Sequence, residues 1–248
     1  MRARPRRRVG AAGAAAAAVT MLTLGACATG PSADQLATVD YAPEAFAGFE
    51  TSTPEAQGLD PDAVAEVYWR AGELESIHSL TVIKDGHVVA QGYFNGTGPE
   101  LSQNVQSVTK SYTGALVGIA IEQGCIAGVD EPMMTYFPEL AGRVQDPRKE
   151  QITIGQLLQM RAGYPWLEAS AEGLDLLFHG FAPSNVVDVP LARDPGTGWD
   201  YSNLSSHFLA IAVARACADE DLLDFAQEHL FDPLATTPSD WTRDWEGY

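Results

Sequence analysis

The chain has 248 residues, of which 46% are hydrophobic, and this is enough to bury the core of one large domain or two small ones. The net charge of −18 excludes the electrostatic attraction to phosphate groups on which nucleic-acid binding depends. We therefore expect no nucleic-acid partner, and we interpret the acidity as a solvated surface that keeps the protein soluble.

Residues 1–26 have the three parts of a secretory signal peptide: a basic start, an apolar run, and small residues before a possible cleavage point. Removing the five arginines of this segment would change the net charge from −18 to −23. The stretch Leu24-Gly25-Ala26-Cys27 resembles the lipobox of bacterial lipoproteins, in which the cysteine becomes the first mature residue and carries the lipid. We expect an exported protein that is anchored to the extracytoplasmic face of the membrane through Cys27. An ordinary signal peptide with an incidental cysteine is the alternative.

Residues 27–50 mix Ala, Pro, Gly, Ser and Asp without a period, which predicts a flexible tether, and the folded domain is expected over residues 51–248. Asp60 followed by Pro61 is a typical helix start. Further on, two alternating runs, Ser79–Lys84 and His87–Phe94, flank Asp85-Gly86, and this predicts a β-hairpin with a two-residue turn.

A serine and a lysine stand three residues apart at the start of an apolar helix that is expected to run to Gln123. Three residues are close to one helical turn, so the side chains of Ser107 and Lys110 should lie on one face within hydrogen-bond reach. Serine is a weak nucleophile until a neighbouring base takes its proton. Lys110 can be that base if its amine is uncharged, which the expected apolar surroundings, supplied by Val105, Val108, Ala115 and Leu116, would favour.

Further helices are expected near residues 153–160, 204–217 and 221–230. Cys125 and Cys217 each fall near a predicted helix end; an exported compartment would permit a disulfide, and two buried thiols are an equal alternative. The five histidines are scattered, and no His and Cys group has the spacing of metal ligands. We therefore expect no metal, and the chemistry of the serine requires no cofactor.

A second motif, Tyr201-Ser202-Asn203, follows a turn-rich stretch and directly precedes an apolar helix. A Ser-x-x-Lys and a Tyr-x-Asn motif would occur together by chance only about 0.02 times in a chain of this composition. A phenol oxygen both donates and accepts hydrogen bonds, so Tyr201 is suited to carry a proton.

With both motifs in place, the chain resembles the serine beta-lactamase and penicillin-binding-protein superfamily. The stretches Gln106–Ser111, Ile152–Leu158 and Pro195–Asn203 are most similar to its esterase and amide-hydrolase branch, which is related to class C beta-lactamases and includes the 6-aminohexanoate-dimer hydrolases. The resemblance implies Ser107 as acyl-enzyme nucleophile, Lys110 as its base and Tyr201 as the proton relay. It also implies that Asn203 hydrogen-bonds Lys110 and the substrate.

The sequence departs from this family at two places. Arg161-Ala162-Gly163 stands where relatives usually have Thr-Ser-Gly. The third motif, Lys-Thr-Gly or His-x-Gly on a strand that supplies half of the oxyanion hole, does not occur between Leu204 and Tyr248. Loss of one oxyanion donor costs about 2.7–4 kcal/mol. We expect the chain to be the N-terminal part of a longer hydrolase, and the 248-residue polypeptide to have little or no activity.

The resemblance implies an α+β fold (α/β sandwich) of the beta-lactamase/transpeptidase type: an antiparallel sheet flanked by a helical region, here without the C-terminal strands. The function it favours is a secreted serine hydrolase that cleaves an ester or amide bond of a small molecule through an acyl-enzyme. A beta-lactamase or D-alanyl-D-alanine carboxypeptidase would use the same residues. A non-catalytic binding module or an inactive fragment is the alternative from another class.

Overall fold

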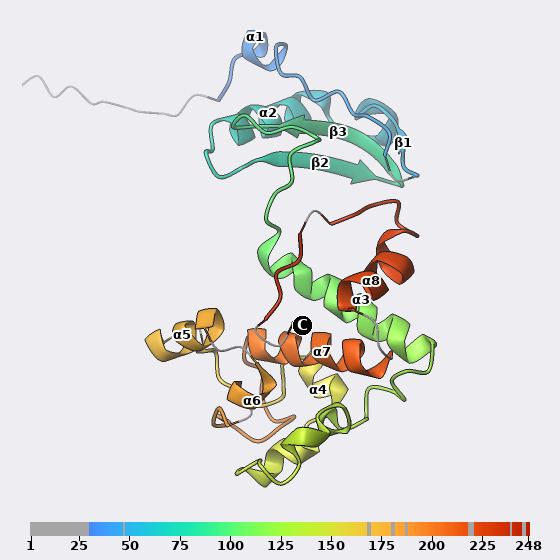
Figure 1. Cartoon of the computed structure of the whole chain (residues 1–248). Coiled ribbons are helices and arrows are strands. Elements are labelled where there is room, and N and C mark those ends of the chain that lie inside the picture. Colours follow the sequence, from blue (N-terminus) through green and yellow to red (C-terminus); the bar gives the residue numbers. More distant parts are fainter. Residues whose placement is uncertain are drawn as a thin grey trace, which may run out of the picture.

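The structure, a computed structural model, describes residues 30–46, 48–167, 170–179, 182–186, 188–217, 221–238, 240–244 and 247–248. These residues form a small sheet with one covering helix and a larger helical region below it (Figure 1). The predicted signal peptide, with its lipobox and Cys27, lies outside the described residues. Within them, no helix is both long and apolar enough to cross a bilayer.

The sheet has three strands in the order β1-β3-β2: β1 (Glu50–Thr51), β2 (Ser79–Lys84) and β3 (His87–Tyr93). Strands β2 and β3 are the predicted hairpin, and Asp85 and Gly86 between them have φ of 51° and 78°, as a two-residue hairpin turn requires. The expected antiparallel sheet is present in part: β2 and β3 pair antiparallel, whereas β1 pairs parallel to β3, with Glu50 opposite His87, so the sheet is mixed.

Helix α2 (Pro61–Gly72) covers one face of this sheet (Figure 1). It begins as predicted, with the Asp60 side chain accepting from the backbone N–H of Asp62 and proline in the first turn. Its Tyr68 side chain packs across β3 at Gly92, where an added Cβ would lie only 2.8 Å from the ring. Val64, Tyr68 and Ala90 form the core of this layer.

The segment that we expected to be a flexible tether takes part in this layer. It contains helix α1 (Ala33–Leu36), which is capped by Ser32, and its Tyr41 ring lies 5.5 Å from that of Tyr68. The Tyr41 carbonyl also accepts a hydrogen bond of 3.0 Å from the Gln91 backbone. Val39 and Tyr41 of this segment therefore pack against the core of the layer, although the segment has no periodic apolar pattern.

The helical region is built around two 14-residue helices, α3 (Thr109–Glu122) and α7 (Asn203–Ala216), which pack against each other. Both are close to their predicted bounds. The shorter helices are α4 (Ile154–Leu158), α5 (Ala171–His179), α6 (Pro183–Val186) and α8 (Leu222–Ala226), the last continued by a π-helical turn at Gln227–Phe231. Helices α5 and α6 lie between the helices expected near residues 153–160 and 204–217, where no helix was expected.

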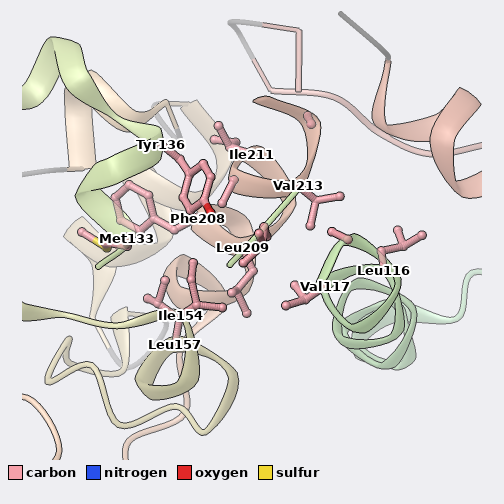
Figure 2. Close-up of a cluster of buried hydrophobic side chains, with 14 of the residues drawn as sticks. Leu116, Val117, Met133, Tyr136, Ile154, Leu157, Phe208, Leu209, Ile211 and Val213 are labelled. Carbon is pink, nitrogen blue, oxygen red and sulfur yellow. The ribbon is translucent and has the colours of Figure 1, made fainter. Parts of the chain in front are cut away.

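The main core lies where α3, α4 and α7 meet (Figure 2). Leu116 and Val117 of α3 face Leu209 and Val213 of α7, and all four are buried. Phe208 of α7 is fully buried, with its ring edge-on to that of Phe137 at 5.1 Å. The packing of α3 against α7 holds the predicted serine motif beside the predicted tyrosine motif.

Candidate active site

Ser107 lies in a 3₁₀ turn (Gln106–Val108) that leads directly into α3. In such a turn side chains three residues apart eclipse one another, so the serine and Lys110 share a face even though only Lys110 is in the α-helix. The preceding residue, Gln106, has φ of 50°, a left-handed conformation that is uncommon outside glycine. Its backbone N–H donates to the side-chain oxygen of Asn104 at 2.8 Å, which holds the turn.

The two residues of the Ser-x-x-Lys motif are in contact. The Lys110 amine donates to Ser107 Oγ at 3.1 Å, as the three-residue spacing predicted. The same amine lies 5.0 Å from the centroid of the Tyr201 ring. One lysine therefore touches both the candidate nucleophile and the candidate proton carrier.

Tyr201 completes a three-residue cluster. Its phenolic oxygen lies 2.5 Å from Ser107 Oγ, although the two residues are 94 positions apart in the chain. Tyr201 stands two residues before α7, whose N-terminal cap is Ser202. Asn203 is the first residue of α7, and its predicted role toward Lys110 and substrate stays a prediction.

The surroundings of the cluster differ from expectation. Val105 and Val108, which were expected to bury Lys110, expose 47% and 55% of their surface, and Ala115 is exposed as well. Helix α3 buries only one side, through Thr113, Leu116, Val117 and Ala120. The apolar run is covered by α7 and by the π-helical turn, where the Tyr112 ring lies 5.5 Å from that of Phe231. Ser107, which precedes the helix, is exposed to solvent.

A cavity of about 580 Å³ opens beside the 3₁₀ turn. One wall comes from residues 102–105, which precede the turn, and from the start of α3, and it includes Val105, Thr109 and Tyr112. The opposite wall includes Phe231 and Trp241, whose rings are 6.0 Å apart. Periodicity alone could not have linked these walls, since the two segments are more than a hundred residues apart.

Two other expectations concern cysteines and metals. Cys125 and Cys217 are both described, both half-buried, and not joined by a disulfide. Across the part of the chain that the structure describes, no group of three or more His, Cys, Asp or Glu side chains could hold a metal ion.

With this geometry in place, comparison with known proteins decides the family. The profile of the family described as Beta-lactamase matches residues 77–245, which is more than half of the chain. The chain belongs to the Beta-lactamase family. The matched range contains Ser107, Lys110, Tyr201 and Asn203.

Several known proteins are similar to parts of this chain. A 6-aminohexanoate-dimer hydrolase from Paenarthrobacter ureafaciens is 37% identical over 68 residues, which are 27% of this chain and 17% of the relative. EstCE1, described as a hydrolase with promiscuous acyltransferase activity, superposes with a TM-score of 0.54 at 19% identity, covering 70% of this chain and 50% of its own.

A variant of simvastatin synthase (LovD) from Aspergillus terreus gives a TM-score of 0.52 at 21% identity, covering 73% of this chain and 52% of its own. At such identities the likeness shows the fold alone, and the fold is of the beta-lactamase/transpeptidase type. The chain thus spans about half the length of these two solved relatives and a smaller share of the hydrolase.

Proposed function

We propose that the protein is a serine hydrolase that cleaves an ester or amide bond of a small molecule through an acyl-enzyme on Ser107. One observation carries the proposal: Ser107 Oγ is within hydrogen-bond distance of both the Lys110 amine, at 3.1 Å, and the Tyr201 phenol, at 2.5 Å. Acyl transfer requires a nucleophile, a base and a second proton carrier, and all three meet here at one exposed oxygen atom.

The first step requires Lys110 in its uncharged form: the amine accepts the Ser107 proton as Oγ attacks the carbonyl carbon of the substrate. The carbonyl π bond opens, and the negative charge moves to the carbonyl oxygen of a tetrahedral intermediate. The backbone N–H of Ser107 is the donor that we assign to this oxyanion. Lys110 is then protonated and lies 5.0 Å from the Tyr201 ring centroid, so its positive charge stays next to the phenol.

In the second step the intermediate collapses and the bond from the carbonyl carbon to the leaving group breaks. The Tyr201 hydroxyl donates its proton to the departing oxygen or nitrogen, and Lys110 restores that proton. Water then attacks the acyl-enzyme, with the same groups acting in reverse. The 2.5 Å separation between the two hydroxyl oxygens supports this role of Tyr201, because it places the phenol beside the bond that Ser107 forms and therefore near the departing group.

The cavity beside the turn is the place that we assign to the substrate. Its lining is mixed, with Val105, Tyr112 and Trp241 beside polar residues such as Asn104, Thr109 and Asp240. It therefore suits an acyl chain that carries both apolar and polar groups. Esterase or amidase activity is favoured over beta-lactamase activity by the segment that is 37% identical to a 6-aminohexanoate-dimer hydrolase. Turnover of nitrocefin against that of p-nitrophenyl acetate separates these activities, and faster nitrocefin turnover would reverse our preference.

Covalent labelling tests the nucleophile directly. After incubation with a fluorophosphonate, tryptic mass spectrometry should find one adduct, on Ser107. Labelling requires only that Ser107 Oγ attacks phosphorus and displaces fluoride, with no later hydrolysis, so it is sensitive even where turnover is slow. Ser107→Ala should abolish the adduct and Lys110→Met should slow its formation about 10²-fold or more. Undiminished labelling of Ser107→Ala would refute the assignment.

We also propose that the protein is exported and anchored by a lipid on Cys27, which rests on the sequence pattern of the leader. Metabolic labelling with a fatty-acid analogue should mark the wild type and leave Cys27→Ala unmarked. The same substitution should move the protein from the membrane fraction to the soluble fraction. Equal labelling of both proteins would contradict the anchor.

A further inference from the structure

The loop that delivers Tyr201 to Ser107 is built around an ion pair. Asp200 directly precedes Tyr201, and its Oδ1 accepts a hydrogen bond of 3.0 Å from Arg193 Nη2. Arg193 Nε lies 2.6 Å from Oδ2, which is close enough for an ion pair although it is not aligned as a hydrogen bond. The two charged residues therefore connect the two ends of the loop 193–200.

The glycine at 198 shows that the Arg193 side chain passes inside this loop. A Cβ added at Gly198 would overlap the Arg193 guanidinium and would lie 2.7 Å from its Cδ. No other residue type leaves room for the arginine on this path. The loop thus closes over the arginine side chain, and the carboxylate next to Tyr201 holds the charged end.

The backbone of the loop is tied to the segment 160–163, which includes the Arg-Ala-Gly departure from the family pattern. The Arg161 guanidinium donates to the Gly196 carbonyl, an interaction that Thr or Ser at this position is too short to copy. Gly163 has φ of 91° and lies directly against the Arg193 carbonyl. The backbone hydrogen bonds are Ala192 to Gly163 at 2.8 Å, Gly196 to Arg161 at 2.8 Å and Asp200 to Met160 at 3.1 Å.

We propose that Arg193 is a positioning residue for Tyr201, which it sets through its ion pair with Asp200. This inference rests on the proposed function, since the position of Tyr201 affects the reaction rate only if Tyr201 transfers a proton. A misplacement of 1 Å at a reacting group lowers rates about 10²-fold. Because the side chains of Arg193 and Asp200 are 43% and 24% exposed, their pair adds little to overall stability, so its main effect falls on geometry.

The test is the rate at which Ser107 is acylated by p-nitrophenyl acetate and phosphonylated by a fluorophosphonate, measured in single turnover with urea unfolding alongside. Arg193→Gln and Asp200→Asn should each slow acylation about 10- to 100-fold, with apparent binding of the ester and the urea midpoint unchanged. The double variant should be no slower than either single variant. Arg193→Lys, which keeps the charge, should recover part of the rate.

Gly198→Ala also separates Arg193 from Asp200, because the added methyl group forces the arginine side chain out of the loop without changing any charge. It should slow acylation like Arg193→Gln, whereas Gly98→Ala, whose added Cβ would meet nothing within 4 Å, should act like the wild type. The inference would be overturned if the rate losses of the two single variants multiplied in the double variant. It would also be overturned if Arg193→Gln and Gly198→Ala both left the rate unchanged. A wild type that neither reagent labels at Ser107 would instead overturn the proposed function.

Discussion

Ser107 Oγ and the Tyr201 phenol lie 2.5 Å apart across the junction of two helices that share one core. The serine precedes α3 and the tyrosine precedes α7, so the packing of these two helices sets the distance between the two oxygen atoms. Chemistry at this site and stability of the helical region therefore depend on the same contacts.

Tyr201→Phe removes the phenolic oxygen and leaves the ring. We expect the rate of Ser107 acylation to fall by about 10²–10⁴, because a positioned proton carrier contributes that much. The acylation rate is measured as the release of p-nitrophenol in a single turnover. Tyr93→Phe, which removes the hydroxyl of an exposed tyrosine in β3, should leave the rate unchanged. Equal rates for the two variants would show that the short hydrogen bond has no catalytic role.

Gly163→Ala should destabilise the protein strongly. Its φ of 91° is unfavourable for alanine, and the new Cβ would overlap the Arg193 carbonyl oxygen. The matched control is Gly142→Ala, with φ of 75° and nothing within 4 Å of the added Cβ, which should cost about 1–2 kcal/mol for the backbone conformation alone. Urea unfolding should show a larger loss for Gly163→Ala. A smaller loss would mean that the loop is not pressed against the segment 160–163.

Stability should fall at high pH because of Tyr68. Burial raises the pKa of Tyr68 to about 12 from the ordinary 10 of an exposed tyrosine, and its hydroxyl donates to the Leu80 carbonyl at 3.0 Å. The folded state thus favours the protonated phenol. Its contribution is complete below pH 10 and is lost as pH rises toward 12. The free energy of unfolding, compared at pH 8 and pH 11, should drop more in the wild type than in Tyr68→Phe.

Phe208→Ala tests the core beneath the site. The side chain is fully buried between Phe137 and Tyr164, so its removal should lower the free energy of unfolding by about 3–5 kcal/mol. Phe46→Ala removes the same atoms from a half-exposed position and should cost far less. Similar losses for both would place the main core elsewhere.

Elements with strong local chemistry were predictable from the sequence. The Asp60-Pro61 start of α2 and the Asp85-Gly86 turn of the hairpin each depend on a few adjacent residues, and both are present. The contact between Ser107 and Lys110 was predictable for the same reason, since three residues separate them. The pairing of Ser107 with Tyr201 was not derivable from spacing, and the expectation came from resemblance to a family.

Features that depend on distant partners escaped prediction. Strand β1 has two residues, too few to carry a pattern, and it exists through its pairing with β3. Val105 and Val108 have the apolar character of core residues, but burial depends on what covers a side chain, and they are exposed. The ion pair of Arg193 with Asp200 was missed because charged residues in a turn-rich stretch are usually solvated.

The backbone conformation of Gln106 should affect attempts to make this protein more heat-resistant. A non-glycine residue at φ of 50° holds the turn under backbone strain of about 1–2 kcal/mol, which the hydrogen bond from its N–H to Asn104 offsets in part. Laboratory evolution that selects only for heat resistance should therefore return glycine or asparagine at position 106. Such variants should survive heating better and, because the residue next to Ser107 is loosened, should react more slowly with a fluorophosphonate at Ser107.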